Sequence, residues 1–371
     1  MTHPYRLVDE ADIPSPALVF YPEFIRRNVA RVVEMAGDPA RLRPHVKTHK
    51  TRELVRMQVA AGVAKHKCAT VAEAEVLASA GATDVLLAYP VVGPTASRLA
   101  KLAALFPGTR FSALVDSDVG LAGLADAARH TPLGAFLDLN VGMDRTGIAV
   151  GDAAAALYAR VAATPNLTAR GLHAYDGHNH QGPVAERAAA AEATLRPVLA
   201  FRDRLSRDGQ ACAAVVAGGT PTFPMYAAMA GVRGLECSPG TYVLHDYGYG
   251  SRHPDFTGIT PAAVLLTRVI AKPTPTRVTL DLGNKAVAAD PLLVNRVRLL
   301  GVPDYKVVGQ SEEHLMVETA HAAEFRVGQV VYALPGHVCP TCALHREALV
   351  AEGGRVVGAW AIAARDRFLS V

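Results

Sequence analysis

Lys47 and Lys50 stand in a polar run, RPHVKTHK at residues 43–50, which ends the second strand predicted along the chain. A lysine at the carboxyl end of a buried strand is partly desolvated, and neighbouring cationic groups lower its pKa further. Such a lysine is a nucleophile that forms imines with carbonyl compounds. Taken alone, the run is explained more simply by two solvent-exposed lysines. Imine chemistry at Lys47 is therefore a hypothesis that needs support from other residues.

His337 and Cys339 form a His-x-Cys pair in the run PGHVC at residues 335–339. On an extended segment both side chains face the same side, within reach of one metal ion, and a thiolate ligand favours zinc. Cys342 and His345 follow at spacings that also suit a closed structural site of the form H-x-C-x-x-C-x-x-H. The spacing alone leaves both kinds of site open.

Three histidines, His173, His178 and His180, cluster near the end of the seventh predicted strand. An imidazole titrates near neutral pH, so His178 or His180 could deprotonate a substrate hydroxyl or orient a metal-bound water. A structural histidine that hydrogen-bonds a loop is an equally good interpretation of either residue.

Two glycine turns, Gly218-Gly219-Thr220 and Gly240-Thr241, follow the last predicted strands. A phosphate dianion needs backbone N–H donors that approach closely, and glycine lacks the Cβ that would block them. The hydroxyls of Thr220 and Thr241 can add hydrogen bonds. Gly-Gly-Thr alone is typical of an ordinary βα turn, but its place after the last strands is where barrels often bind phosphate.

The elements that must position these residues are repeated βα units. From about residue 17 to 245, short apolar runs alternate with Ala-rich amphipathic segments, which is typical of a parallel sheet covered by helices. Predicted helices span residues 22–35 and 184–208, and another begins at Thr70, where Glu73 completes a capping box. Eight strands, the number of a closed barrel, are predicted at residues 17–21, 42–49, 66–70, 84–90, 111–117, 134–140, 171–177 and 213–220.

Beyond about residue 257 the pattern changes to short strands with Pro and Gly breaks, at residues 262–271, 277–283, 305–309, 314–318 and 329–334. We therefore expect an α/β fold with two domains. A (β/α)8 TIM-type barrel covers residues 15–256, and a C-terminal β domain covers residues 257–371 together with 1–14.

Composition excludes several classes of protein. Half of the 371 residues are hydrophobic, and the net charge of +4 is spread along the chain, which argues against a nucleic-acid partner. The N-terminus lacks an apolar signal segment and no run is long enough to span a bilayer, so we expect a cytoplasmic protein without a membrane partner. Five cysteines argue against a disulfide framework, and Cys68, Cys212 and Cys237 are expected to be buried packing residues.

Six short sequence motifs resemble those of a known family and occur in the order in which the family has them. They are RPHVKTHK, MDRTGI (143–148), HAYDGH (173–178), GGTPT (218–222), PGTY (239–242) and PGHVC. Over nearly the whole chain, the sequence resembles the D-threonine aldolase and D-serine dehydratase family. The resemblance implies the alanine-racemase-like fold, fold type III of the pyridoxal-phosphate enzymes, which is a barrel with a C-terminal β domain.

The resemblance also implies roles for residues. Lys47 carries pyridoxal 5'-phosphate as an imine, and Arg145 and Tyr175 line this cofactor. The turns with Gly219, Thr220, Gly240 and Thr241 hold its phosphate. His337 and Cys339 alone bind a divalent metal, zinc or manganese, with open positions for water and the substrate hydroxyl.

The implied substrate is a small D-3-hydroxy-amino acid, and the enzyme is expected to be a homodimer. Retro-aldol cleavage would release glycine and an aldehyde, whereas loss of the hydroxyl would make the enzyme a D-serine dehydratase. We place the aldolase first because HAYDGH and DLGNKA look closer to its members, although Cys339 stands where many aldolases have aspartate. A metal-free racemase would leave PGHVC without a role, and a non-catalytic cofactor carrier would resemble the barrel alone.

Overall fold

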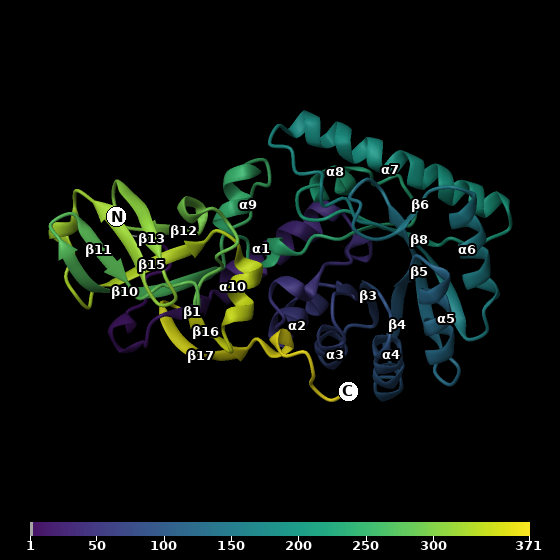
Figure 1. Cartoon of the computed structure of the whole chain (residues 1–371), viewed down its shortest axis with the longest axis horizontal. Helices are drawn as coiled ribbons and strands as arrows, with labels where there is room; N and C mark the ends of the chain where they lie inside the picture. The colour runs from purple at the N-terminus through teal and green to yellow at the C-terminus, as the bar shows by residue number, and fades with distance from the viewer. Residues whose placement is uncertain (1–2) are drawn as a thin grey trace. The chain divides into compact units, whose positions relative to one another are not determined.

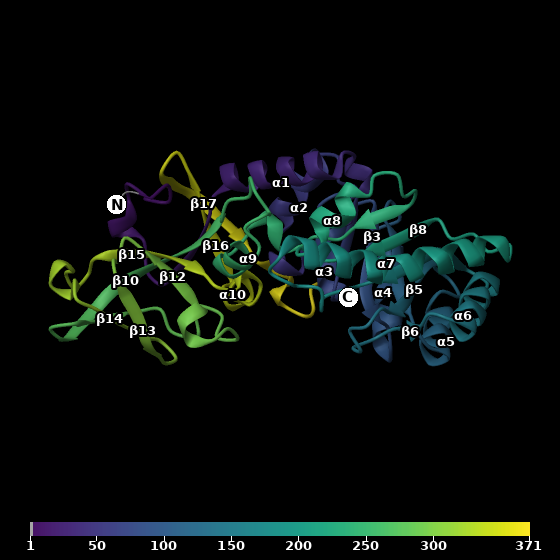
Figure 2. The same cartoon turned by 90° about the horizontal axis from the view of Figure 1, so that it is seen from above.

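Figures 1 and 2 show the computed structural model of the protein, which describes residues 3–371. Contacts divide the chain into two compact units. The barrel unit comprises Ala30–Lys47, Arg52–Gly240 and Asp366–Val371, and the β unit comprises the chain up to Val29, Thr48–Thr51 and Thr241–Arg365.

The barrel unit is built on a parallel sheet of strand order β2-β3-β4-β5-β7-β8-β9. Its two edges are bridged by the segment 42–45, because Leu42 pairs with Cys237 of β9 and His45 pairs with Lys67 of β2, both in parallel. The sheet therefore closes with eight parallel members. The strands are β2 (Lys65–Cys68), β3 (Asp84–Pro90), β4 (Arg110–Val115), β5 (Leu133–Asn140), β7 (Leu167–Ala174), β8 (Ala214–Ala217) and β9 (Leu235–Cys237), and the short β6 (Ile148–Ala149) pairs with β5.

Helices lie on the outside of this sheet (Figures 1 and 2). They are α2 (Arg52–Ala60), α3 (Val71–Ser79), α4 (Pro94–Leu105), α5 (Asp118–Ala127), α6 (Asp152–Ala163), α7 (Val184–Arg207) and α8 (Phe223–Ala228). The predicted start of α3 is confirmed, since the Thr70 hydroxyl accepts the Glu73 N–H at 3.1 Å. Leu86, Leu114, Phe136 and Val216 from four of the strands form a buried apolar cluster, as expected for the filled interior of a barrel.

One predicted barrel strand is wrong, and a second is confirmed only in its first half. Residues 17–21 contain β1 (Ala17–Phe20), which pairs antiparallel with β10 (Ala263–Thr274) and parallel with β16 (Glu347–Glu352) in the other unit's sheet. A four-residue apolar run has the same pattern in any buried strand, so it does not reveal its partners. The predicted strand 42–49 is extended only at its start and continues into a 3-10 turn, Val46–Thr48. The eighth place is filled by β9, whose three residues, Leu-Glu-Cys, are too short for a periodic signal.

The β unit contains a sheet of order β13-β14-β11-β10-β1-β16-β17, with β15 pairing β10 and β12. Its further strands are β11 (Arg277–Leu280), β12 (Val297–Leu300), β13 (Tyr305–Gln310), β14 (Leu315–Thr319), β15 (Val330–Pro335) and β17 (Arg355–Ala361). Two short helices, α9 (Tyr247–Arg252) and α10 (Val338–Leu344), interrupt these strands. The prediction that this part of the chain consists mainly of short strands is confirmed, although β12, β16 and β17 were not expected.

The longer helix α1 (Pro22–Ala36) runs from one unit into the other. The 3-10 turns are Glu10–Asp12, Pro39–Arg41, Val46–Thr48, Thr241–Val243, Leu293–Asn295, Ala322–Glu324 and Ala363–Arg365. In the part of the chain that the structure describes, none of the helices combines the length and the apolar character needed to cross a bilayer.

Candidate functional site

Tyr175 follows β7, and its ring is the centre of a cluster of cations in the barrel unit. The Lys47 Nζ lies 5.7 Å from the ring centroid and the Arg145 Cζ lies 4.8 Å from it. A third cation, Lys67 on β2, places its Nζ at 5.5 Å. The structure thus brings together the predicted residues Lys47, Arg145 and Tyr175. It surrounds one aromatic ring with three cationic side chains.

Lys67 is a site residue that the sequence analysis missed. It is only 3% exposed, and its Nζ lies 3.4 Å from Nε2 of His173. The other ring nitrogen of His173 lies 2.7 Å from Oδ1 of Asp138, and Oδ2 of Asp138 accepts a hydrogen bond from the Thr146 hydroxyl at 2.8 Å. A buried chain of Lys67, His173 and Asp138 therefore leads inward from the Tyr175 ring. The sequence feature that could have indicated Lys67 is a charged residue within a short strand that is otherwise expected to be buried.

The electrostatics of this chain follow from burial. Burial, and then the positive charge of Lys47, lower the pKa of Lys67 to about 7. Burial also lowers the pKa of His173, so its neutral imidazole accepts from Lys67 while Nδ1–H donates to Asp138. Burial works to raise the pKa of Asp138, but hydrogen bonds from His173 and Thr146 outweigh it and lower the pKa. Asp138 is therefore a carboxylate that holds the His173 tautomer.

The two glycine turns adjoin Tyr175 and each other. Gly218 has a φ of +79°, and a Cβ there would meet the Tyr226 ring at 2.6 Å, so glycine is required. A Cβ on Gly219 would lie 3.3 Å from Cε2 of Tyr175. The Gly240 N–H donates to the Thr220 hydroxyl at 3.1 Å, which joins the second turn to the first.

Asp176 anchors the first turn. Its two carboxylate oxygens accept hydrogen bonds from the Thr222 hydroxyl at 3.0 Å and the Tyr226 hydroxyl at 2.6 Å. Burial raises the pKa of Asp176 despite these bonds. Asp176 thus links the strand end that carries Tyr175 to the helix that begins after the turn, α8.

This arrangement fits a flat anionic ligand such as pyridoxal 5'-phosphate. The three cations around Tyr175 favour a negatively charged ligand, and glycine at position 219 avoids a Cβ that would crowd the Tyr175 ring at 3.3 Å. The Ser238 hydroxyl, on the residue after β9, is buried and has no hydrogen-bond partner among the described residues. A buried hydroxyl without a partner is costly, which points to a polar group that completes the site.

His178 and His180 lie in the turn after β7. His178 Nε2 would be 3.3 Å from a Cβ on Gly142, in the loop after β5, and its Nδ1 is buried with no partner in the described part of the chain. The His180 side chain is exposed. His178 is therefore half-buried against the loop after β5, whereas His180 faces solvent.

His337 and Cys339 lie together in the β unit, but not on the extended segment that the spacing suggested. His337 is the extended N-cap residue of α10 and Cys339 lies in its first turn, and the two side chains interact across this helix start. His337 Nδ1 lies 2.6 Å from Oδ2 of Asp290. The Cys339 thiol donates to the Thr48 hydroxyl at 3.2 Å and lies 3.8 Å from the Thr241 hydroxyl.

Neighbouring groups change the pKa of His337, one of the two predicted metal ligands. Burial works to lower the pKa of His337, but the Cys339 sulfur and the Asp290 carboxylate outweigh it and raise the pKa to about 9. Asp290, which the sequence analysis missed, occupies Nδ1 and leaves Nε2 for a metal, as carboxylates commonly do behind metal-binding histidines.

Cys342 and His345 do not complete a closed site. Cys342 is fully buried, and burial raises its pKa well above the ordinary value. His345 Nε2 lies 2.8 Å from the Ala286 carbonyl oxygen and donates to it. Within residues 3–371, no three or more His, Cys, Asp and Glu side chains gather as a metal-binding group.

Comparisons with known proteins agree with this geometry. The alanine racemase N-terminal domain matches residues 22–245, and a putative serine dehydratase domain matches residues 262–351. The 3-hydroxy-D-aspartate aldolase of Paracoccus denitrificans (strain Pd 1222) is 30% identical over 97% of this chain and 94% of its own. The D-threo-3-hydroxyaspartate dehydratase of Delftia sp. (strain HT23) is 26% identical over 92% of this chain and 95% of its own. The solved structure of D-threonine aldolase from Filomicrobium marinum superposes with a TM-score of 0.87 at 28% identity, covering 98% of each chain.

Proposed function

The chain belongs to the D-threonine aldolase and D-serine dehydratase family of pyridoxal-phosphate enzymes, and we propose that it cleaves D-3-hydroxy-amino acids to glycine and an aldehyde. The observation that carries the proposal is the grouping of Lys47, Lys67 and Arg145 around Tyr175. The relatives support the aldolase reaction, because 3-hydroxy-D-aspartate aldolase and D-threonine aldolase match over nearly the full chain.

Lys47, Arg145 and Tyr175 would hold the cofactor ring, and Gly219, Thr220, Gly240 and Thr241 would bind its phosphate. When bound, pyridoxal phosphate supplies an electron sink that weakens the bonds of the substrate α-carbon. Lys47 would be the lysine that the cofactor modifies, because Lys67 is already engaged by His173.

His337 and Cys339 would hold a divalent metal, zinc or manganese, and a thiolate ligand favours zinc. Two protein ligands leave positions free for water and for the β-hydroxyl of the substrate. Asp290 would keep the His337 ring oriented, because it already bonds Nδ1.

A histidine would take the proton of the substrate hydroxyl as the Cα–Cβ bond breaks, after which the α-carbon gains a proton to give glycine. His178 is our first candidate, since it is half-buried and its Nδ1 has no hydrogen-bond partner among the described residues. His180 is the alternative. An imidazole side chain is the common general base of enzymes at neutral pH, which suits this role.

The test of the reaction uses D-threonine, D-phenylserine, D-3-hydroxyaspartate and D-serine, with glycine and 2-oxo acids measured as products. We expect glycine from at least one of the first three substrates and no turnover of the L-enantiomers. A substituted β-carbon favours cleavage because it leaves as a more stable carbonyl compound.

A D-serine dehydratase is the second candidate, and it is favoured by the Cys339 ligand and by the similar dehydratase of Delftia sp.. The metal would then assist departure of hydroxide, for which unsubstituted D-serine suffices. Pyruvate from D-serine, without glycine from the other substrates, would replace the aldolase proposal with this one.

The metal proposal is tested by metal analysis of four alanine variants. We expect His337→Ala and Cys339→Ala to lose bound metal and most activity while keeping the cofactor. Cys342→Ala and His345→Ala are the controls and should keep both. Equal loss of metal from all four variants, with unfolding, would establish a closed structural site instead.

A homodimer in the cytoplasm stays a prediction from the sequence. Light scattering of the purified protein measures the oligomeric state directly.

A further inference from the structure

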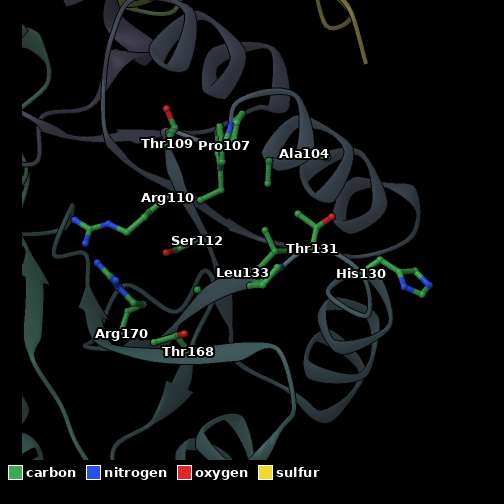
Figure 3. Close-up of a pocket in the computed structure, with 14 residues that line it drawn as sticks. Ala104, Pro107, Thr109, Arg110, Ser112, His130, Thr131, Leu133, Thr168 and Arg170 are labelled. Carbon is green, nitrogen blue, oxygen red and sulfur yellow. The ribbon is translucent and has the colours of Figure 1, made fainter.

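A pocket of about 470 Å³ lies at the amino ends of β4, β5 and β7 in the barrel unit. Tyr175 and the glycine turns follow the carboxyl ends of strands, so this pocket is at the opposite end of the sheet. Figure 3 shows the Arg110 and Arg170 guanidinium groups on the same side of the pocket, with the Ser112 side chain beside them. The His130 ring points away from this group.

The pocket has an excess of positive charge. Arg110 and Arg170 both contact Oδ2 of Asp84, at 3.3 and 2.8 Å, while Arg43 contacts Oδ1 at 2.7 Å. Arg43 and Lys65 also share Glu236. In this network four cationic side chains face only two carboxylates, and the residues that line the pocket include no carboxylate. Two positive charges therefore lack a carboxylate within the network.

Gly134 leaves the space that the pocket needs. A Cβ at this position would lie 2.2 Å from the Ser112 Oγ and 2.9 Å from the Arg170 Cγ. Any larger residue would displace both side chains. The glycine on β5 thus lets the Ser112 hydroxyl and the Arg170 side chain approach each other from β4 and β7, the two strands that flank β5, and Thr168 lies next to Arg170 in the lining.

We propose that this pocket binds a small organic phosphate. Arg110 and Arg170 present forked donors that match phosphate oxygens, and Ser112 adds a hydroxyl donor. Ala104, Pro107 and Leu133 also line the pocket and lie, together with Thr131, away from the two guanidinium groups in Figure 3. Their apolar surface would contact the organic part of the ligand. The volume is within the usual range for small-molecule sites. This inference does not depend on the proposed reaction.

The test is calorimetric titration of the cofactor-saturated enzyme, in which the cofactor's own phosphate site is filled, with phenyl phosphate and with inorganic phosphate. We expect phenyl phosphate to bind roughly tenfold more tightly, because its ring removes apolar surface from water. Arg110→Gln and Arg170→Gln should each weaken both ligands roughly tenfold. Ala104→Phe should weaken phenyl phosphate alone, since it fills the apolar wall without a change of charge.

Arg129→Gln is the matched control, because Arg129 is an exposed arginine paired with Asp126 and does not line the pocket. It should bind both ligands like the unmodified enzyme. Arg110 is 67% exposed, so its variant folds even if Arg170→Gln does not. Absence of phenyl phosphate binding, or full binding by Arg110→Gln, would overturn the site. Equal affinity for phenyl phosphate and inorganic phosphate would contradict the proposal that the ligand has an organic part.

Discussion

Lys47 and Lys67 lie at similar distances from the Tyr175 ring, yet their surroundings differ. Lys67 is buried and contacts His173, whereas Lys47 is half-exposed in the turn after the segment 42–45. Lys50 has a φ of +56°, and its carbonyl accepts the Ala364 N–H. The lysine with both access and a position beside Tyr175 is therefore Lys47.

Borohydride reduction of the holoenzyme, followed by peptide mass spectrometry, should place the pyridoxyl group on Lys47. Lys47→Ala should abolish the label and lower activity by several orders of magnitude, while the control Lys50→Ala keeps both. A label on Lys50 or Lys67 in the unmodified enzyme would contradict the assignment.

Lys67 gives the protein a pH-dependent stability. In the unfolded chain a lysine keeps its proton up to about pH 10.5, whereas folded Lys67 releases it near pH 7. Between these values the unfolded state binds more protons, so the contribution of Lys67 to stability rises with pH. Below pH 7 both states are protonated and the full penalty of the buried charge is present.

Lys67→Met should therefore raise the free energy of unfolding of the cofactor-free protein by roughly 1 to 3 kcal/mol at pH 6, with the gain shrinking towards pH 10. Denaturant titrations at several pH values measure this. Lys101→Met, at an exposed lysine of α4, is the control and should show no such trend. A gain that does not change with pH would show that packing, not charge, is responsible.

At the level of elements, the Asp246 carboxylate accepts backbone N–H groups at the N-termini of two helices of the β unit. Asp246 Oδ1 accepts the Tyr249 N–H at 2.7 Å in α9, and Oδ2 accepts the Val338 N–H at 3.0 Å in α10. Helices of six and seven residues are not stable alone, so their tertiary anchors decide whether they form. Because α10 carries Cys339, Asp246 also positions the proposed metal ligands.

Asp246→Ala should lower the free energy of unfolding by about 2 to 4 kcal/mol, since the buried Val338 N–H and the part-buried Tyr249 N–H lose their acceptor. It should also weaken metal binding, measured by competition with a chelator. Asp38→Ala is the matched control, because Asp38 caps the Ala40 N–H at an exposed site, and it should cost about 0.5 to 1 kcal/mol without an effect on metal. Unchanged metal affinity in Asp246→Ala would disprove the positioning role.

At the scale of the whole molecule, closure of the barrel depends on a buried arginine. Arg43 is 1% exposed and lies on the segment that joins β9 to β2. It binds Asp84 of β3 and Glu236 of β9 at 2.7 and 2.6 Å. Burial alone would lower its pKa, but the two carboxylates raise it. Arg43 thus connects three members of the closed sheet.

Arg43→Met should lower the free energy of unfolding by roughly 3 to 5 kcal/mol, because it leaves two buried carboxylates with fewer partners. Urea titration measures the loss. Arg56→Met, at an exposed arginine of α2, should change stability by less than about 1 kcal/mol. Full stability of Arg43→Met would mean that main-chain pairing alone closes the barrel.

The sequence by itself determined the parallel βα unit and much of the group around Tyr175. Lys47 could be selected because polar residues at the carboxyl ends of parallel strands meet at one end of a barrel. Arg145 and Tyr175 could be selected because the runs that contain them resemble a known family. The start of α3 could also be predicted from the sequence, since Thr70 and Glu73, which form the capping contact, are only three residues apart.

Only the tertiary structure decided which distant segments pair. β1 joins strands more than 240 residues away in the chain, and the contacts of Lys67 with His173 and of His337 with Asp290 span 106 and 47 residues. The sequence around a short apolar run or a single charged residue does not indicate which distant segment it will contact. The start of α10 at Val338 likewise depends on Asp246, which lies 92 residues earlier and accepts the Val338 N–H. Local spacing constrains neighbours along the chain, whereas the burial that selects long-range partners exists only in the folded protein.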